Sequence, residues 1–291
     1  MFVSILINGL ISGGVYAILA IGFSLIFGVA KIMNMAHTAF YMVTAFLMIA
    51  CTTLFFGLPV PVAAVLSIFV ISLLGVIVYK LCFDRVKVHE TAVMIISVAV
   101  AMLFEEVVLL TFGAQFQRVP PFVEGYFEIE GVRVLNQHLF TAGACILTLI
   151  GIWFLLAKTK LGKAIRAVDQ DQEMANVMGI NVTMTSMLVM GISVMLSGVA
   201  GAVVAPTIMV SPLMWTSPLV IVLSAVVLGG IGSVRGSAIA AFILGFAETL
   251  VVFLVPDGSF LRGAVSLTTM VMVLLIRPEG LFGVKFEEER L

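Results

Sequence analysis

Charged residues are scarce in this sequence. Only 11% of its 291 residues are Asp, Glu, Lys or Arg, whereas 62% are hydrophobic and the mean hydropathy is +1.25. Soluble domains contain about 25% charged and roughly 45–50% apolar residues. One water-soluble core cannot enclose so much apolar surface. The composition therefore excludes a soluble enzyme, a nucleic-acid-binding protein and a disordered chain.

Cysteine and the common catalytic motifs are also nearly absent. The three cysteines, Cys51, Cys82 and Cys145, lie in or beside apolar runs, and their spacing indicates neither a metal site nor a disulfide framework. The sequence has no Gly-x-x-x-x-Gly-Lys-Ser/Thr phosphate loop, no His-Glu-x-x-His and no Gly-x-Ser-x-Gly. We therefore expect a chain that is not an enzyme, binds no metal or cofactor and hydrolyses no nucleotide itself.

Long apolar runs dominate what is present, and a membrane-spanning helix needs about 20 such residues. The runs cover approximately 5–29, 37–56, 59–80, 91–112, 140–157, 184–205, 218–231, 237–255 and 261–276. The run at 218–231 is short and that at 37–56 has a polar start, so a half or broken helix is expected at each. The sequence thus predicts an all-α integral membrane protein of eight to nine segments, with one transmembrane domain over residues 1–291.

The distribution of basic residues predicts the orientation, because cytoplasmic loops carry an excess of Lys and Arg. With the N-terminus outside and the C-terminus inside, only Arg118, Arg133 and Arg262 of the 15 basic residues lie outside. The other 12 are Lys31, Lys80, Arg85, Lys87, Lys158, Lys160, Lys163, Arg166, Arg235, Arg277, Lys285 and Arg290. Because no basic residue precedes the first run, we expect an uncleaved span and not a removed signal peptide.

Two loops are long enough to have structure of their own. Residues 113–139 are expected outside the cytoplasm, where apolar residues between 127 and 134 alternate around Glu130-Gly131 and predict a short hairpin. Residues 158–183 are expected in the cytoplasm. There, Asp169 or Asp171 can cap a helix that ends near Gly179. This short helix favours docking onto a cytoplasmic protein, and a plain connecting loop is the alternative.

Three carboxylates lie inside apolar runs: Glu105, Glu106 and Glu248. An ionisable group within a membrane is costly and usually faces the bundle interior or water. These residues could line a substrate or proton pathway, or they could be hydrogen-bonded to hold helices together. Adjacent helical positions point in different directions, so Glu105 and Glu106 cannot face the same way.

Three motifs carry a resemblance to a known family. The first places Glu173, Ala175 and Gly179 at relative positions 0, +2 and +6, the spacing of the Glu-Ala-Ala-x-x-x-Gly loop of ABC importer permeases. The second runs from Tyr16 to Val29 and on to Asn34-Met35-Ala36-His37. The third is Val227–Gly236, followed by Gly245 and Glu248. Together they resemble the bacterial permeases for branched-chain amino acids (the LivH type), although Met174 and Thr38 depart from the family pattern.

The resemblance implies roles for residues in each motif. The cytoplasmic loop would couple to an ATPase through Arg166, Asp169, Glu173, Ala175 and Gly179. The positions of the residues themselves, rather than the resemblance, suggest a candidate substrate pathway of Asn34, His37, Glu105, Glu106 and Glu248, although His37 could instead be a histidine with satisfied hydrogen bonds at the membrane interface. Structural glycines that allow tight, non-helical backbone at a membrane edge are Gly229, Gly230, Gly232 and Gly236.

The same resemblance implies a multi-subunit importer in the bacterial cytoplasmic membrane. Its partners would be two cytoplasmic ATPase subunits that hydrolyse ATP, a second homologous permease chain, a periplasmic or lipid-anchored binding protein and membrane lipid, with no nucleic acid. The substrate stays open among branched-chain amino acids, urea, amides and aromatic compounds. The alternative is a self-contained, proton-coupled transporter or channel, in which an intramembrane glutamate carries the proton.

Overall fold

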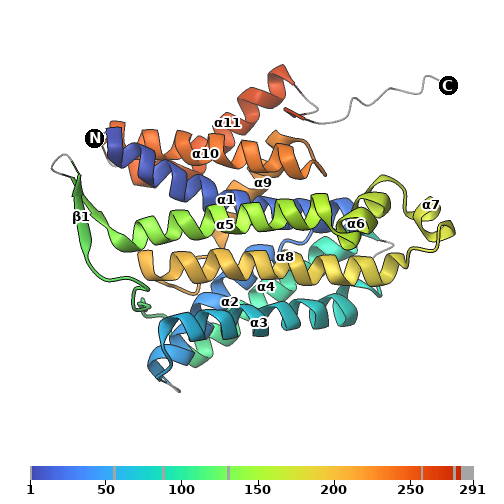
Figure 1. The fold of residues 1–291 in the computed structure, drawn as a ribbon, viewed down its shortest axis with the longest axis horizontal. Coiled ribbons are helices and arrows are strands. Elements are labelled where there is room, and N and C mark those ends of the chain that lie inside the picture. Colours follow the sequence, from blue (N-terminus) through green and yellow to red (C-terminus); the bar gives the residue numbers. More distant parts are fainter. Residues whose placement is uncertain are drawn as a thin grey trace.

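The computed structural model describes residues 2–54, 57–86, 89–129, 132–256, 258–277 and 280–282. Helices form almost all of it. The long helices are α1 (Phe2–Ala30), α3 (Val60–Val78), α4 (Glu90–Phe112), α5 (Asn136–Lys158), α8 (Val182–Val204) and α10 (Val234–Leu254). The shorter ones are α2 (His37–Ile49), α6 (Lys160–Gln170), α7 (Gln172–Val177), α9 (Thr216–Gly229) and α11 (Arg262–Ile276). In Figure 1 the long helices run side by side along the longest axis of the molecule.

Each apolar run that the sequence predicts contains a helix. Six helices are long and apolar enough to cross a membrane, and three shorter apolar helices cover His37–Thr53, Thr216–Gly229 and Arg262–Ile276. The short helices include those expected at 37–56 and 218–231. π-helical turns extend α2 over Ala50–Leu54 and α3 over Tyr79–Phe83, and short 3-10 helices cover Ala205–Thr207 and Gly258–Leu261. The prediction of an all-α membrane protein is therefore confirmed.

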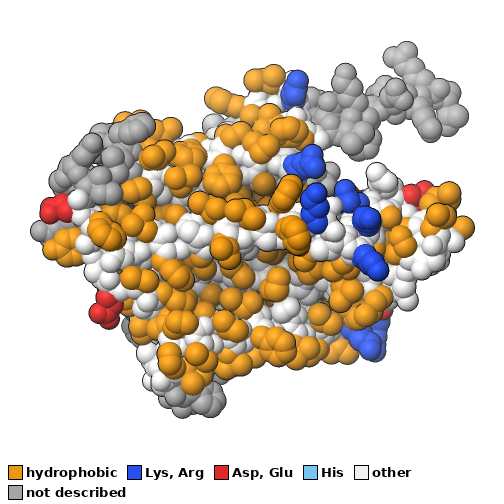
Figure 2. All heavy atoms as spheres, viewed as in Figure 1, with side chains coloured by type: hydrophobic (Ala, Val, Ile, Leu, Met, Phe, Trp, Pro, Cys, Tyr) orange, Lys and Arg blue, Asp and Glu red, His pale blue; other side chains and the backbone are white. Residues whose placement is uncertain are grey.

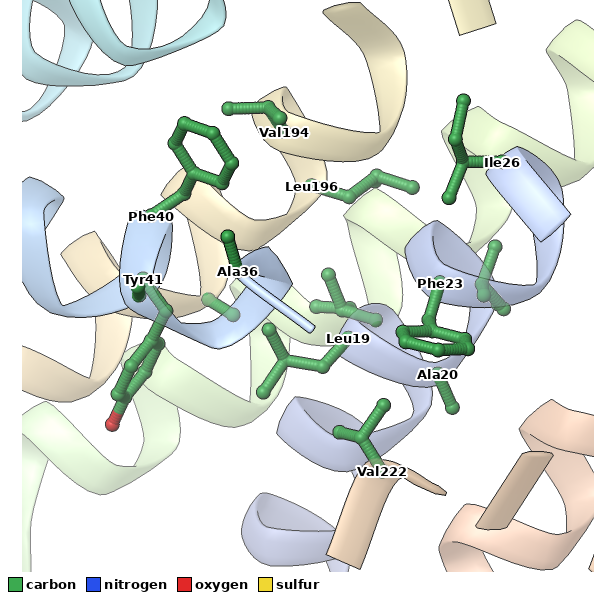
Figure 3. Close-up of a cluster of buried hydrophobic side chains, with 14 of the residues drawn as sticks. Leu19, Ala20, Phe23, Ile26, Ala36, Phe40, Tyr41, Val194, Leu196 and Val222 are labelled. Carbon is green, nitrogen blue, oxygen red and sulfur yellow. The ribbon is translucent and has the colours of Figure 1, made fainter. Parts of the chain in front are cut away.

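Helix α1 lies at the centre of the bundle and contacts α5, α8, α9 and α10. Figure 3 shows apolar side chains from α1, α2, α8 and α9 converging on one cluster, among them Leu19, Phe40, Val194 and Val222. Close backbone packing joins α1 to α10, because a Cβ atom on Gly245 would lie only 2.5 Å from the Cα atom of Gly13. Small residues permit such approach between membrane helices, which gain stability from van der Waals contact.

The loop between α4 and α5 forms the predicted hairpin. Strands β1 (Tyr126–Ile129) and β2 (Val132–Leu135) pair antiparallel, with Tyr126 opposite Leu135; the turn residues Glu130 and Gly131 lie outside the described residues. Helix α5 begins at Asn136, four residues before the apolar run. The polar side chains of its first turn form hydrogen bonds with backbone groups of the loop. Asn136 Nδ2 donates to the Glu124 carbonyl (2.9 Å), and Gln137 Oε1 accepts from the Phe122 amide (2.9 Å).

A glycine-rich turn connects α9 to α10. Gly230 and Gly232 have positive φ angles of 96° and 87°, which a side chain would strain. A Cβ atom on Gly229 would collide with the backbone of Gly236, so the two helix ends touch. The C-terminal segment completes the turn, since the amides of Leu281 and Phe282 donate to the carbonyls of Leu228 and Gly229. The expected tight, non-helical backbone is thus found at Gly230 and Gly232, whereas Gly229 and Gly236 are helical and allow the close contact.

Candidate functional site

The loop between α5 and α8 folds into two short helices. Thr159 caps α6 by accepting a hydrogen bond from the Gly162 amide at 3.0 Å. Asp171 ends α6 and caps α7, because its Oδ1 atom accepts from the amides of Glu173 (2.9 Å) and Met174 (3.0 Å). Of the two caps that the sequence allowed, Asp171 is therefore the one present.

Gly179 ends α7, as expected. Its φ angle is +85°, its amide donates to the Asn176 carbonyl, and the Ile180 amide donates to the Ala175 carbonyl, each at 3.0 Å. This pair of hydrogen bonds is the Schellman arrangement, in which the residue after the helix adopts a left-handed conformation. The helix is thus fixed at both ends although it is only six residues long.

An apolar tip projects from α7. Met174, Val177 and Met178 are 60%, 80% and 79% exposed, whereas Ala175 on the opposite side is buried. Positions i, i+3 and i+4 share one helix face, so the three side chains form a single patch. In Figure 1 α7 is the part of the bundle farthest from the hairpin. An exposed apolar patch rimmed by polar residues is typical of a protein-binding surface.

Polar residues surround a shallow hollow beside this tip. It has a volume of about 490 Å³ and includes Glu173, Asn176, Gly179 and Thr183 in its lining. Three of the five expected coupling residues, Glu173, Ala175 and Gly179, therefore lie together at the projecting end.

The other two expected coupling residues lie apart from this end. Arg166 and Asp169 are on α6, which packs against α1, and a Cβ atom on Gly28 of α1 would lie 2.5 Å from Asp169 Oδ1. Burial raises the pKa of Asp169, and the Lys31 ammonium, 4.0 Å from Oδ1, opposes that rise. The structure thus separates the predicted set into an α7 group and an α6 pair.

One hydrogen bond ties the projecting helix to the bundle. The side-chain amide of Gln172, the first residue of α7, donates to the carbonyl of Val29 in the last turn of α1 (2.7 Å). Lys31 follows with a positive φ of 55°, an unusual conformation for a residue with a side chain. The first residue of α7 is therefore hydrogen-bonded to the end of the central helix.

Glu248 is buried among three helices. Only 2% of it is exposed; its Oε2 atom accepts from the Tyr16 hydroxyl of α1 at 3.0 Å, and its Oε1 atom accepts from the Ser266 hydroxyl of α11. Both carboxylate oxygens thus have protein donors. Of the two roles left open by the sequence, this geometry favours the one in which the carboxylate holds helices together.

Glu105 and Glu106 have different surroundings, as expected from their adjacent positions. Glu105 is partly buried, and its Oε2 atom accepts a hydrogen bond from Trp215 Nε1 (2.8 Å) at the start of α9. Glu106 is exposed on the surface of α4. An exposed carboxylate on a membrane helix is costly against lipid, so it indicates a face that water or another protein covers.

Asn34 and His37 are fully buried. His37 Nε2 lies 3.0 Å from the Leu19 carbonyl oxygen, and its Nδ1 lies 3.3 Å from the Ser193 hydroxyl oxygen. The Asn34 side-chain oxygen accepts from the Ala36 amide at 3.1 Å. His37 is therefore positioned to join α1, α2 and α8 inside the bundle, and Asn34 Nδ2 lies 3.8 Å from the Met190 sulfur of α8.

Comparison with known proteins identifies the family. The model of the family described as "Branched-chain amino acid transport system / permease component" matches residues 5–276. This chain belongs to that family. The permease is therefore a multi-pass protein of the inner membrane, in agreement with its six long apolar helices.

Curated relatives cover nearly the whole permease. It is 27% identical to the high-affinity branched-chain amino acid transport system permease protein BraD of Pseudomonas aeruginosa over an alignment of 292 positions, which covers 96% of this chain and 94% of BraD. It is 26% identical to LivH, the protein of the same description in Escherichia coli, over an alignment of 300 positions that covers 97% of this chain and 96% of LivH. The predicted LivH-type resemblance is thus confirmed.

A solved structure shares the fold. PsaBC from Streptococcus pneumoniae in complex with Fab superposes with a TM-score of 0.54, covering 96% of the permease and 94% of that chain at 17% identity. A likeness at this level of identity supports the arrangement of the helices.

Sequence reasoning missed several residues at these positions. Trp215 and Ser266 hydrogen-bond to intramembrane glutamates without belonging to any predicted motif. Tyr16 begins the second motif, but its bond to Glu248, 232 residues away, depends on helix packing that the motif does not reveal. The sequence does indicate a role for Met174. It precedes Val177 and Met178 by three and four residues, which places the three side chains on one helix face.

Proposed function

We propose that this permease carries branched-chain or related amino acids inward as the membrane subunit of an ATP-driven importer. The proposal rests on the structure of α7. This helix has caps at both ends, an exposed apolar tip and a hydrogen bond to α1. A carrier that works alone does not need such a docking surface. The names of the relatives support the substrate class.

The tip of α7 would enter a cleft on a cytoplasmic ATPase. Such interfaces depend on a few buried apolar contacts, and Met174, Val177 and Met178 can supply them. On the face shown in Figure 2, the Lys and Arg side chains gather at the end of the bundle that carries α6 and α7. Because basic residues mark the cytoplasmic side, this supports α7 inside and the N-terminus outside.

A second permease chain would complete the pathway beside α4. This helix contacts α2 and the π-helical turn after α3, and most of its surface is exposed. Glu106 lies on that surface, where a carboxylate would otherwise face lipid. A partner chain there would enclose Glu106, with Glu105 and Trp215 beside it. A binding protein would deliver the substrate from outside, and ATP would be hydrolysed by the partner subunits, with no cofactor on this chain.

Cross-linking tests the ATPase contact. Val177→Cys, in a background without the native cysteines, should form a covalent adduct with co-expressed ATPase subunits in membranes. Glu124→Cys, exposed in the loop with the hairpin, is the matched control and should give no adduct.

Reconstitution tests the energy source. Vesicles with the complete complex should accumulate leucine only with ATP and the binding protein present. Uptake by the permease alone, driven by a proton gradient, would contradict the proposal and favour the self-contained carrier.

A further inference from the structure

A groove lies between α1, α5 and α10 at the end of the bundle where α6 packs. Its volume is about 420 Å³. Its walls run from Ile21 to Val29 on α1 and from Leu149 to Ala157 on α5. At a rise of 1.5 Å per residue, either stretch is about 12 Å long, which gives the depth of the groove. These walls are mainly apolar, and the half-exposed Trp153 lies among them. The groove therefore follows the membrane-spanning part of the helices.

Two arginines lie at one end of this groove. Arg166 comes from α6 and Arg235 from the first turn of α10, and both are exposed. Among the residues that the structure describes, neither forms an ion pair, whereas the one acid in the lining, Asp169, lies 4.0 Å from Lys31. The N-terminus of α10 adds a partial positive charge. This end of the groove is therefore built to attract an anion.

A buried hydroxyl lies deeper in the same groove. Ser24 is fully buried, and its Oγ atom has no hydrogen-bond partner in the described parts of the chain. Other hydroxyls in these helices, such as those of Thr148 and Thr249, donate to the carbonyl four residues earlier. A buried hydroxyl without a partner is unfavourable, so Ser24 indicates an acceptor outside the described residues.

We propose that this groove binds one anionic phospholipid. The phosphate lies between Arg166 and Arg235, one acyl chain follows the apolar wall, and an ester carbonyl accepts the Ser24 hydrogen bond. Basic pockets between membrane helices on the cytoplasmic side bind lipid headgroups by the same charge attraction. A free phosphate ion would use the arginines but not the apolar wall. The proposal does not depend on an ATPase partner.

Native mass spectrometry of the full-length permease in mild detergent tests this proposal. After delipidation, we expect phosphatidylglycerol to bind at least about tenfold more tightly than phosphatidylcholine, since charge-assisted hydrogen bonds have this strength. The double variant Arg166→Ala/Arg235→Ala should lose that preference. Lys163→Ala, which removes an exposed charge from the same helix outside the groove, is the matched control and should retain it.

A second variant tests the apolar wall separately from the charge. Ala238→Phe narrows the groove, and we expect it to lower phosphatidylglycerol binding about tenfold. If Ala238→Phe does not purify as a folded protein, Trp153→Ala, which widens the groove, replaces it in the test. Trp153→Ala should also lower phosphatidylglycerol binding. Equal binding of the two lipids, equal loss in Lys163→Ala, or displacement by millimolar inorganic phosphate would overturn the proposal.

Discussion

The Gln172 side chain donates a 2.7 Å hydrogen bond to the Val29 carbonyl, which joins the first residue of α7 to the last turn of α1. Gln172→Ala should leave the fold intact, because one such bond is worth about 0.5–1.5 kcal/mol. We expect leucine uptake by the reconstituted complex to fall several-fold while ATPase binding persists. Gln170→Ala, an exposed neighbour at the end of α6, is the control. Equal uptake in the two variants would show that this bond transmits nothing.

Gly179→Val should abolish uptake. A β-branched residue at φ +85° strains the end of α7 by about 1–2 kcal/mol and changes the shape of the surface beside the apolar tip. The permease should still insert in the membrane, but co-purification of the ATPase should weaken. Glu173→Ala should have a smaller effect, because a charge at the solvent edge is worth under about 1 kcal/mol. Normal uptake by Gly179→Val with its ATPase bound would argue against the coupling assignment.

The proposed orientation predicts which side of the membrane a reagent must reach. A cysteine in place of the exposed Lys163 should react with an impermeant maleimide only from the cytoplasmic side. A cysteine at Arg118, between α4 and β1, should react only from outside. The measurement is labelling in intact cells against inverted vesicles, and the reverse pattern would invert the topology.

The adjacent glutamates of α4 should respond unequally to neutralisation. Glu105→Gln alters the contact with Trp215, and Trp215→Phe should reproduce its effect on uptake. Glu106→Gln removes a charge without such a contact, so its effect should appear in the association of the two permease chains. Uptake and cross-linked dimer yield are the two measurements. Equal, complete loss of uptake in both glutamine variants would favour proton coupling.

Tyr16→Phe should lower stability more than transport. The change leaves Glu248 Oε2 without its hydroxyl donor inside the bundle, at a cost of about 1–3 kcal/mol. A fall in melting temperature of roughly 2–4 °C per kcal/mol is expected in detergent, with little change in uptake per folded molecule. Ser266→Ala, which removes the donor to Glu248 Oε1, should likewise lower the melting temperature with little change in uptake. A stable but inactive Tyr16→Phe variant would assign Glu248 to the pathway.

Local chemistry explains which features could be predicted from the sequence. Apolar run length located the apolar helices that the structure describes, and the short run at 218–231 predicted the short α9. The ends of α7 followed from an aspartate and a glycine at the appropriate spacing. The environment of Glu248 depends on donors 232 and 18 residues away, which only the packing of α1, α10 and α11 brings together. The separation of Arg166 from Gly179 likewise depends on how α6 packs against the bundle.

The contact between Gly13 and Gly245 has a consequence for motion. Two backbones this close leave no room for sliding, so α1 and α10 should rotate as one body during transport. Spin labels on these two helices would then keep a constant separation through the cycle. Helix α4 makes few contacts with the rest of the described chain, so we expect it to tilt against that body.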